Sequence, residues 1–139
     1  MKQLFCAAIA ALALLAPPPV TAAESSAVSN ISWDEVDRVY NPQSDATDLQ
    51  KAEAWKNYEG KKVRWTGKVS HISEGWGGIK LQVRMRPDTL TSDLIITLED
   101  SERARALQLR DNQRVTFEAI LEDWGTIMPM SLDHGRIVE

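Results

Sequence analysis

Residues 61–86, KKVRWTGKVSHISEGWGGIKLQVRMR, decide the fold of this chain. Apolar and polar side chains alternate in two runs, with a period of two that is typical of strands with one face on a core and one in water. The glycine-rich loop at residues 74–78 joins the runs, so the stretch predicts a hairpin of two strands, with a sharp bend at Gly67. The inward residues are Val63, Trp65, Gly67 and Val69 in the first strand and Ile79, Leu81, Val83 and Met85 in the second.

Three further strands are predicted on the C-terminal side of this hairpin. The same alternation places Leu94, Ile96 and Leu98 in a third strand and Val115, Phe117, Ala119 and Leu121 in a fourth. A short helix, capped by Asp100 or Ser101, is expected between them. Residues 127–138 make a fifth strand, in which Pro129 and Gly135 mark an edge or an irregular stretch.

Two helices are expected ahead of the hairpin. Residues 31–40 predict a short one with Ser32 as its N-cap, and residues 45–60 predict a second one capped by Asp45 or Thr47. In the second helix a three-residue spacing creates an apolar stripe, which we expect to pack against the rest of the protein. The stripe consists of Leu49, Ala52 and Trp55.

The order of these elements predicts the fold class. It is strand, strand, strand, short helix, strand, strand, preceded by the N-terminal helices. An antiparallel five-stranded sheet that closes on itself, with the helix between strands three and four plugging one end, is the Greek-key barrel of the OB-fold. We therefore expect a mainly β protein built on a five-stranded OB-fold barrel.

Two segments add a family resemblance. Residues 59–69, EGKKVRWTGKV, resemble the first strand of a bacterial OB-fold family named for its similarity to the tRNA anticodon-binding domain, in which G-K-x-V-x-x-x-G-x-V is typical. Residues 110–119, RDNQRVTFEA, resemble the family's turn into strand four, although the family usually has Gly before Asp there and Gly in place of Ala119. Asn112 can adopt the left-handed conformation that Gly would supply. Many family members look like exported proteins of unassigned function, so the resemblance implies an exported OB-fold and does not by itself imply tRNA binding.

The N-terminus has the pattern of a secretory signal peptide. Lys2 supplies a positive start, residues 4–16 form an apolar run, and small residues offer a cleavage site after Ala22 or Ala23. The run is shorter than the ~20 residues that a spanning helix needs, so no integral membrane span is expected in the mature form. We expect a periplasmic or secreted protein.

The rest of the chain is expected to form one domain. Of the 139 residues, 43% are hydrophobic and 26% are charged, as in ordinary globular proteins. The single cysteine, Cys6, lies in the leader, so the mature chain has no internal disulfide. The expected divisions are a signal peptide at 1–23, a flexible lead-in at 24–31, an N-terminal helical segment at 32–60 and the OB-fold barrel at 61–139.

Charge is unevenly distributed along the chain. Residues 61–86 contain seven Lys or Arg and one acid, Glu74, although the whole chain has a net charge of −4. A basic region in an acidic protein is a candidate footprint for an anionic partner. The alternative is a solvated strand face whose bases pair with acids on neighbouring strands.

A basic groove with exposed aromatic rings is how OB-folds bind oligonucleotides and oligosaccharides. Here bases project from the first two strands, and Trp76 lies on the loop at the hairpin tip, either exposed for stacking or folded back over the barrel. Trp65 is expected in the core, whereas the sequence does not decide between a buried and an exposed position for Trp124. We expect an anionic oligomer as ligand, either an oligonucleotide or an oligosaccharide. The candidate ligand-binding residues are Arg64, Lys68, Trp76, Lys80, Arg84 and Arg86.

Catalytic and metal-binding motifs do not stand out. His71 and His134, the two histidines, lack metal-ligand spacing. Ser131, Asp133 and His134 share one strand, where adjacent side chains point to opposite faces, so they cannot assemble a catalytic triad by themselves. We therefore expect a non-catalytic protein without a cofactor or a metal.

The alternative function is a protein-interaction module of the cell envelope. A barrel edge can receive a strand from a partner protein, and the N-terminal helices offer another surface. We favour a simpler role for Trp33, Tyr40 and Trp55, which is to dock these helices onto the domain. The sequence leaves the oligomeric state open.

Overall fold

The computed structural model describes residues 27–87, 90–125 and 129–138. The predicted signal peptide at residues 1–23 lies outside the described residues, and the predicted domain boundaries stay predictions. In chain order the elements are α1 (Trp33–Tyr40), α2 (Asp48–Trp55), β1 (Lys62–Gly75), β2 (Gly78–Arg84), β3 (Leu94–Leu98), the 3-10 turn η1 (Asp100–Glu102), α3 (Arg103–Ala106), β4 (Arg114–Asp123) and β5 (Met130–Ile137).

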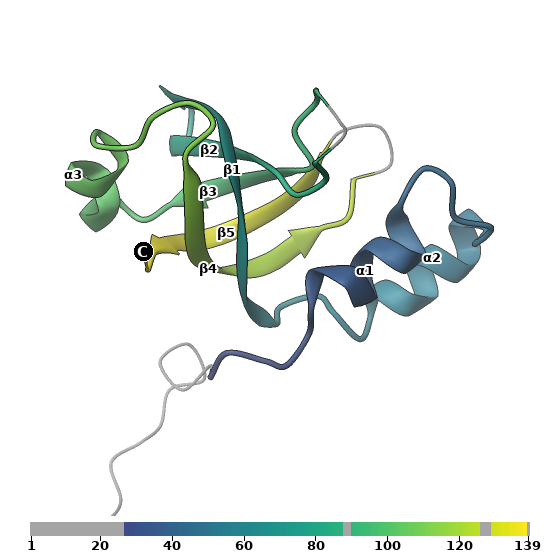
Figure 1. Ribbon diagram of the computed structural model, residues 1–139. Helices are drawn as coiled ribbons and strands as arrows, with labels where there is room; N and C mark the ends of the chain where they lie inside the picture. Colours follow the sequence, from purple (N-terminus) through teal and green to yellow (C-terminus); the bar gives the residue numbers. More distant parts are fainter. Residues whose placement is uncertain (1–26, 88–89, 126–128, 139) are drawn as a thin grey trace, which may run out of the picture.

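The strands form a closed barrel in the order β1-β2-β3-β5-β4, and β1 also pairs with β4 (Figure 1). This confirms the predicted five-stranded barrel with a short helix between β3 and β4 and two helices ahead of it. The expectation of an antiparallel sheet throughout is wrong at one pair, because β3 and β5 run parallel. Strand direction cannot alternate all the way around a closed ring of five. Since five is odd, one parallel pair is required.

The barrel interior is filled by the residues that the alternation placed inward. Their removal from water is the main stabilising contribution to a fold of this size. Met85 is only half-buried, because β2 ends one residue before it. The largest fully buried side chains of the barrel are Val63, Val69, Leu81, Val83, Leu94, Ile96, Val115, Phe117, Leu121 and Leu132.

β5 is irregular around Gly135, as the sequence predicted. A Cβ on Gly135 would lie 2.4 Å from Ile96 Cγ2 and 3.1 Å from the Thr97 carbonyl oxygen, so only glycine fits there. The β3–β5 pairing shifts register between Ile96 and Leu98. β5 is not an edge strand, since it pairs with both β3 and β4.

The N-terminal helices begin where the capping residues predicted. Ser32 Oγ and Thr47 Oγ1 each accept a hydrogen bond from the backbone N–H three residues later. The predicted cap of the third helix, Asp100 or Ser101, is wrong. Glu99 is the N-cap of η1, and its side chain makes no capping hydrogen bond. The backbone N–H of Glu99 still donates to the Gly135 carbonyl of β5. The helical turn therefore starts at the next residue, which no longer bonds to the sheet.

α2 contacts the rest of the protein mainly through its C-terminal end. Trp55 is buried, with its ring centroid 5.5 Å from that of Tyr40 and 6.3 Å from that of Tyr58. Leu49 is 78% exposed and Ala52 is exposed too, so the prediction that the stripe packs is wrong for these two residues. Trp55, in the last turn of α2, is the buried residue of this helix, whereas Leu49 in its first turn faces solvent.

Trp65 anchors the segment ahead of α1 to the barrel. Its Nε1 donates to the Ile31 carbonyl at 2.9 Å, and its ring meets that of Trp33 edge to face at 5.4 Å. The Ser29 N–H donates to the Lys62 carbonyl at 2.8 Å. Figure 1 shows α1 and α2 beside the barrel, with α3 on its other side. Within residues 27–87, 90–125 and 129–138, no helix is long and apolar enough to cross a bilayer.

Candidate anion-binding site

β1 exchanges one neighbouring strand for the other beside Gly67. Up to Lys68 it pairs with β4, and from Lys68 onward it pairs with β2. A Cβ on Gly67 would lie 2.5 Å from Val83 Cγ1 and 2.9 Å from the Arg84 carbonyl oxygen. Glycine is therefore required for the close approach of β1 to β2 at this point.

Lys68 consequently has a cation beside it on both sides. Its Cα partners are Arg84 on β2 and Arg114 on β4, and we call these three residues the basic row. Like charges directly opposite each other on neighbouring strands are destabilising. The basic row therefore costs stability unless an anion lies among its side chains.

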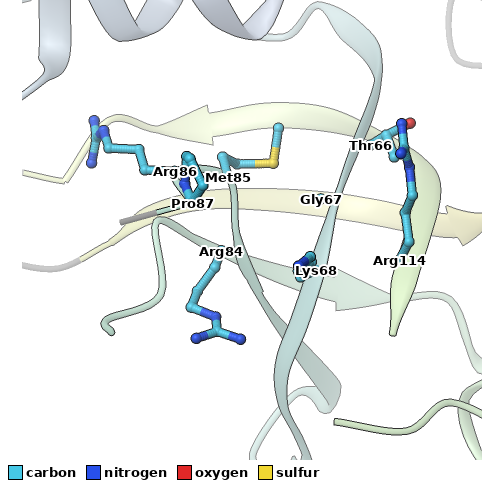
Figure 2. A pocket seen from close by; sticks show the side chains of 8 residues that line it. All are labelled: Thr66, Gly67, Lys68, Arg84, Met85, Arg86, Pro87 and Arg114. Carbon is cyan, nitrogen blue, oxygen red and sulfur yellow. The ribbon is translucent and has the colours of Figure 1, made fainter. Parts of the chain in front are cut away.

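The basic row borders a surface pocket of about 280 Å³. In Figure 2, Lys68 stands between Arg84 and Arg114. Among the described residues that line the pocket, half are Lys or Arg and none is Asp or Glu, so an anion that enters meets four cations and no carboxylate from these residues. The lining residues are Thr66, Gly67, Lys68, Arg84, Met85, Arg86, Pro87 and Arg114.

Among the described residues, no acid forms an ion pair with a member of the basic row. Arg84 donates to the neutral amide oxygen of Asn112, while its buried Nε has no hydrogen-bond partner among the described residues. Lys68 and Arg114 also form no ion pair with any acid in the described ranges. A bound anion would supply the missing negative charge.

Arg64 and Lys80, two further predicted ligand residues, are held by cross-strand partners. Arg64 Nε donates to Glu118 Oε2 at 2.8 Å, and Lys80 Nζ donates to Thr97 Oγ1 at 2.7 Å. For Arg64 the alternative interpretation is therefore confirmed, because this base pairs with an acid on a neighbouring strand. Neither residue lines the pocket.

Arg86 lines the pocket, but its charge is compensated. Its Nη1 lies 2.6 Å from Asp93 Oδ1, and its Nε donates to Asp37 Oδ1 of α1 at 3.0 Å. The guanidinium also lies 5.5 Å from the centroid of the Trp33 ring, a cation–π contact. Arg86 therefore joins α1 to the barrel at the border of the pocket.

Trp76, the sixth predicted ligand residue, is exposed rather than folded back, with 99% of its surface open to solvent. Gly75 pairs with Gly78, so Trp76 and Gly77 form the two-residue turn of the hairpin. β1 runs seven residues beyond Lys68 before this turn, which is about 23 Å of extended strand. Trp76 thus lies apart from the pocket.

A second, larger cavity of about 760 Å³ lies between the N-terminal helices and the barrel. Its aromatic lining is Trp33, Tyr40 and Trp124, and the centroids of the last two rings are 5.3 Å apart. We call this cavity the aromatic cleft. Arg86 lines both the aromatic cleft and the basic pocket. The side chain of Arg86 would therefore separate a ring bound in the aromatic cleft from an anion bound in the basic pocket.

Neutral polar groups accompany the rings in the aromatic cleft, which is also lined by the charged residues Asp48, Lys51, Arg86 and Asp93. Ser92 Oγ lies 2.9 Å from Gln82 Oε1 and 3.1 Å from Ser70 Oγ. Tyr40 donates its hydroxyl to the Lys51 carbonyl at 2.7 Å. Burial, together with a nearby tyrosine, raises the pKa of Tyr40 to about 12, so it is a neutral phenol at physiological pH.

Sequence reasoning did not identify Arg114 or the aromatic cleft. The alternation in β4 makes Arg114 an outward residue next to Val115, but only the β1–β4 pairing sets it beside Lys68. Trp124, which the sequence left open, lines the aromatic cleft. Its neighbour Tyr40 was expected only to dock a helix.

Recognition by charge and stacking is the chemistry that these groups offer. His134 Nδ1 lies 3.5 Å from the carboxylate of its chain neighbour Asp133. Across the described ranges no group of three or more His, Cys, Asp or Glu is placed to hold a metal ion.

The comparisons with known proteins bear on the fold. No protein-family model matches the chain, and no curated protein matches it. A solved structure from Klebsiella pneumoniae, described as a "putative nucleic acid-binding lipoprotein", is similar with a TM-score of 0.59 and 16% identity, over 87% of this chain and 100% of that one. An OBody bound to hen egg-white lysozyme has a TM-score of 0.45 and 17% identity, over 60% of this chain and 86% of that one.

Asparaginyl-tRNA synthetase from Pyrococcus horikoshii, complexed with asparaginyl-adenylate, is a further similar structure. Its TM-score is 0.45 and its identity 15%, over 81% of this chain and 23% of the synthetase. Likeness at such identities concerns the fold alone. Together with the strand order, the similarity to the Klebsiella structure shows that this chain forms an OB-fold domain.

Proposed function

We propose that this protein is an exported, non-catalytic OB-fold module that binds an anionic oligomer, an oligonucleotide or an acidic oligosaccharide, across the basic row. The observation that carries the proposal is the register of three strands, which sets Arg84, Lys68 and Arg114 side by side. An anion bound there replaces mutual repulsion with charge-assisted hydrogen bonds, which are stronger than those between neutral groups.

Two features favour an oligomer over a single ion. The basic row crosses three strands, and neighbouring strands lie about 4.8 Å apart, so each cation can meet a separate anionic group. Beyond Arg86, the aromatic cleft offers rings on which a base or a sugar of the same ligand can stack.

Export is part of the proposal because of the leader pattern in residues 1–23. The similarity to a bacterial lipoprotein supports it. The description of that protein as a nucleic acid binder supports the inclusion of oligonucleotides among the ligands.

The test is a binding titration followed by fluorescence anisotropy. The probes are a labelled single-stranded oligonucleotide and a labelled sulfated oligosaccharide, each titrated with the purified protein at several salt concentrations. We expect binding of at least one probe that weakens as salt rises. The Lys68→Gln variant is expected to reduce the slope of log K against log salt by about 0.7 for the oligonucleotide, since one phosphate contact is lost.

The matched control is Lys61→Gln, which removes an exposed lysine just ahead of β1 and outside the pocket. This variant is expected to keep the wild-type salt slope. Salt-independent binding, or the same change of slope in both variants, would contradict the proposal.

The alternative is a protein-interaction module of the cell envelope. Closure of the barrel leaves each of the five described strands with two neighbours, so the N-terminal helices are the surface that this alternative would use. A partner protein that co-purifies independently of salt, and that Lys68→Gln still binds, would favour it.

A further inference from the structure

Trp76 stands free of the rest of the described chain. Its neighbours Gly75, Gly77 and Gly78 have no side chains that could cover the ring. Apart from the two chain neighbours of each glycine, no atom of the described residues lies within 4 Å of a Cβ built on Gly75 or Gly78, so the turn projects into open space. Gly77 and Gly78 have φ values of 86° and 114°, which favour glycine. An indole that is 99% exposed on such a turn is accessible to a partner outside the chain.

The hairpin that carries Trp76 is braced beside its turn. Arg103 of α3 makes two hydrogen bonds to Glu74, Nη1–Oε2 at 2.7 Å and Nη2–Oε1 at 2.8 Å. The guanidinium holds the pKa of Glu74 below its ordinary value, so the carboxylate is ionised at neutral pH. The indole is therefore presented on a hairpin held against α3.

Leu107 is a second exposed apolar side chain at this end of the barrel. It is 77% exposed, and its N–H bonds to the Arg103 carbonyl, one helical turn earlier. Residues four apart in a helix share a face. Because Arg103 reaches Glu74, two residues before Trp76, Leu107 lies at the barrel end where α3 meets the hairpin. We call Trp76 and Leu107 the apolar tip.

The size and shape of the apolar tip select the kind of partner. A stable protein interface buries about 800 Å² on each side, whereas one Trp side chain offers at most about 250 Å². A projecting turn also cannot enclose a small molecule, which needs a concave site. A lipid surface accepts an isolated projecting indole, since Trp rings favour the headgroup level of a bilayer.

Lys80 adds a charge that fits the same partner. Its Nζ lies 3.6 Å from a Cβ built on Gly77, which places an ammonium group beside the turn. Cations next to an inserted ring are attracted to the phosphates of lipid headgroups.

We propose that the apolar tip inserts Trp76 and Leu107 into the headgroup region of a lipid bilayer. The contact is small, so it is reversible and works as one of several attachments. The basic row lies about 23 Å away along β1, which leaves it open to its own ligand. This inference does not depend on the proposed function.

The test uses lipid vesicles whose acyl chains carry bromine near the headgroups, because bromine quenches only the indoles that touch it. The vesicles are phosphatidylcholine, with and without phosphatidylglycerol. The protein has five Trp residues, so the Trp76→Ala variant shows which part of the quenching belongs to the tip. We expect quenching and a blue shift in the wild type, loss of both in Trp76→Ala and a weaker effect in Leu107→Ser.

Leu49→Ser is the matched control, since Leu49 of α2 is 78% exposed and Leu107 is 77% exposed. It is expected to retain the wild-type quenching. All three residues are exposed, and an unchanged thermal unfolding midpoint checks that each variant folds. Absence of quenching in the wild type, or equal quenching in Trp76→Ala, would overturn the inference. So would a Trp76→Ala variant that loses oligonucleotide binding but keeps its vesicle quenching, because Trp76 would then belong to the oligomer site.

Discussion

Lys68 of β1 and Arg114 of β4 are Cα partners in the antiparallel β1–β4 ladder, so two cations face each other across neighbouring strands. Side chains in such pairs have Cβ atoms about 5 Å apart, and like charges at this separation repel. Arg84 extends the same repulsion on the β2 side. Local conflicts of this kind are expected at functional sites, where binding outweighs stability.

Removing one cation of the basic row should stabilise the free protein. We expect Arg114→Gln to raise the free energy of unfolding by about 0.2–1 kcal/mol at low salt, with a smaller gain at high salt because the repulsion is screened. The same variant should bind anionic oligomers more weakly. Urea unfolding and anisotropy titrations measure the two effects. Arg110→Gln, an exposed base outside the pocket, should show neither, and a destabilised Arg114→Gln with normal binding would count against the site.

Gly67 should be far less tolerant of a methyl group than Gly75. A Cβ at Gly67 would lie 2.7 Å from Met85 Sδ and 2.9 Å from the Arg84 carbonyl oxygen, whereas a Cβ at Gly75 has nothing within 4 Å. Because a backbone carbonyl cannot move aside, we expect Gly67→Ala to lower the free energy of unfolding by about 1–3 kcal/mol. Gly75→Ala should change it by less than about 0.5 kcal/mol. Denaturant midpoints of the two variants make the comparison, and equal midpoints would contradict it.

Arg86 should matter more for stability than its partner Asp37. The side chain of Asp93 is only 4% exposed, so Arg86→Met would leave a buried carboxylate without its cation. We expect a loss of about 3 kcal/mol. Asp37→Asn should cost about 1 kcal/mol or less, because Arg86 then keeps Asp93 and the Asp37 side chain is 24% exposed. Thermal unfolding of both variants is the measurement, and the reverse ranking would refute the assignment.

Tyr40 should make the protein sensitive to alkaline pH. Its pKa is about 12 in the folded protein, against an ordinary value of 10.0. Since the folded state holds the phenol proton more tightly than the unfolded chain, this stabilisation is complete below pH 10 and is lost as pH rises from 10 towards 12. Tyr40→Phe should therefore flatten the fall in stability over this range. Urea unfolding across that pH window checks it, and an unchanged slope in the variant would argue against burial of the phenol.

Much of the local structure could be predicted because its causes are local. A strand with one buried face needs an apolar side chain at every second position, and Val63, Trp65, Phe117 and Leu121 meet that need. Helix starts follow from capping side chains that act over three residues, as Ser32 does in α1.

The apolar stripe of α2 shows the limit of predicting burial from local sequence patterns. Its three-residue spacing falls about 60° short of a full turn at each step. Leu49 and Trp55, six residues apart, therefore lie about 120° apart around the helix. Periodicity states which residues share a face, but not whether another element lies against it. Trp55 meets Tyr40 and Tyr58, while Leu49 faces solvent.

The candidate site likewise combines features that the sequence predicts with features that depend on the tertiary structure. By itself, the sequence determined that Lys68 and Arg84 project outward from a hairpin rich in basic residues, because alternation along a strand is a property of neighbours in the chain. Only the tertiary structure decided which bases keep an uncompensated charge. Closing the barrel paired Arg64 with Glu118, 54 residues away, and set Arg114 beside Lys68. The physical reason is that strand register pairs residues that are far apart in the chain. Whether a base keeps its charge uncompensated depends on which residue the neighbouring strand places opposite it.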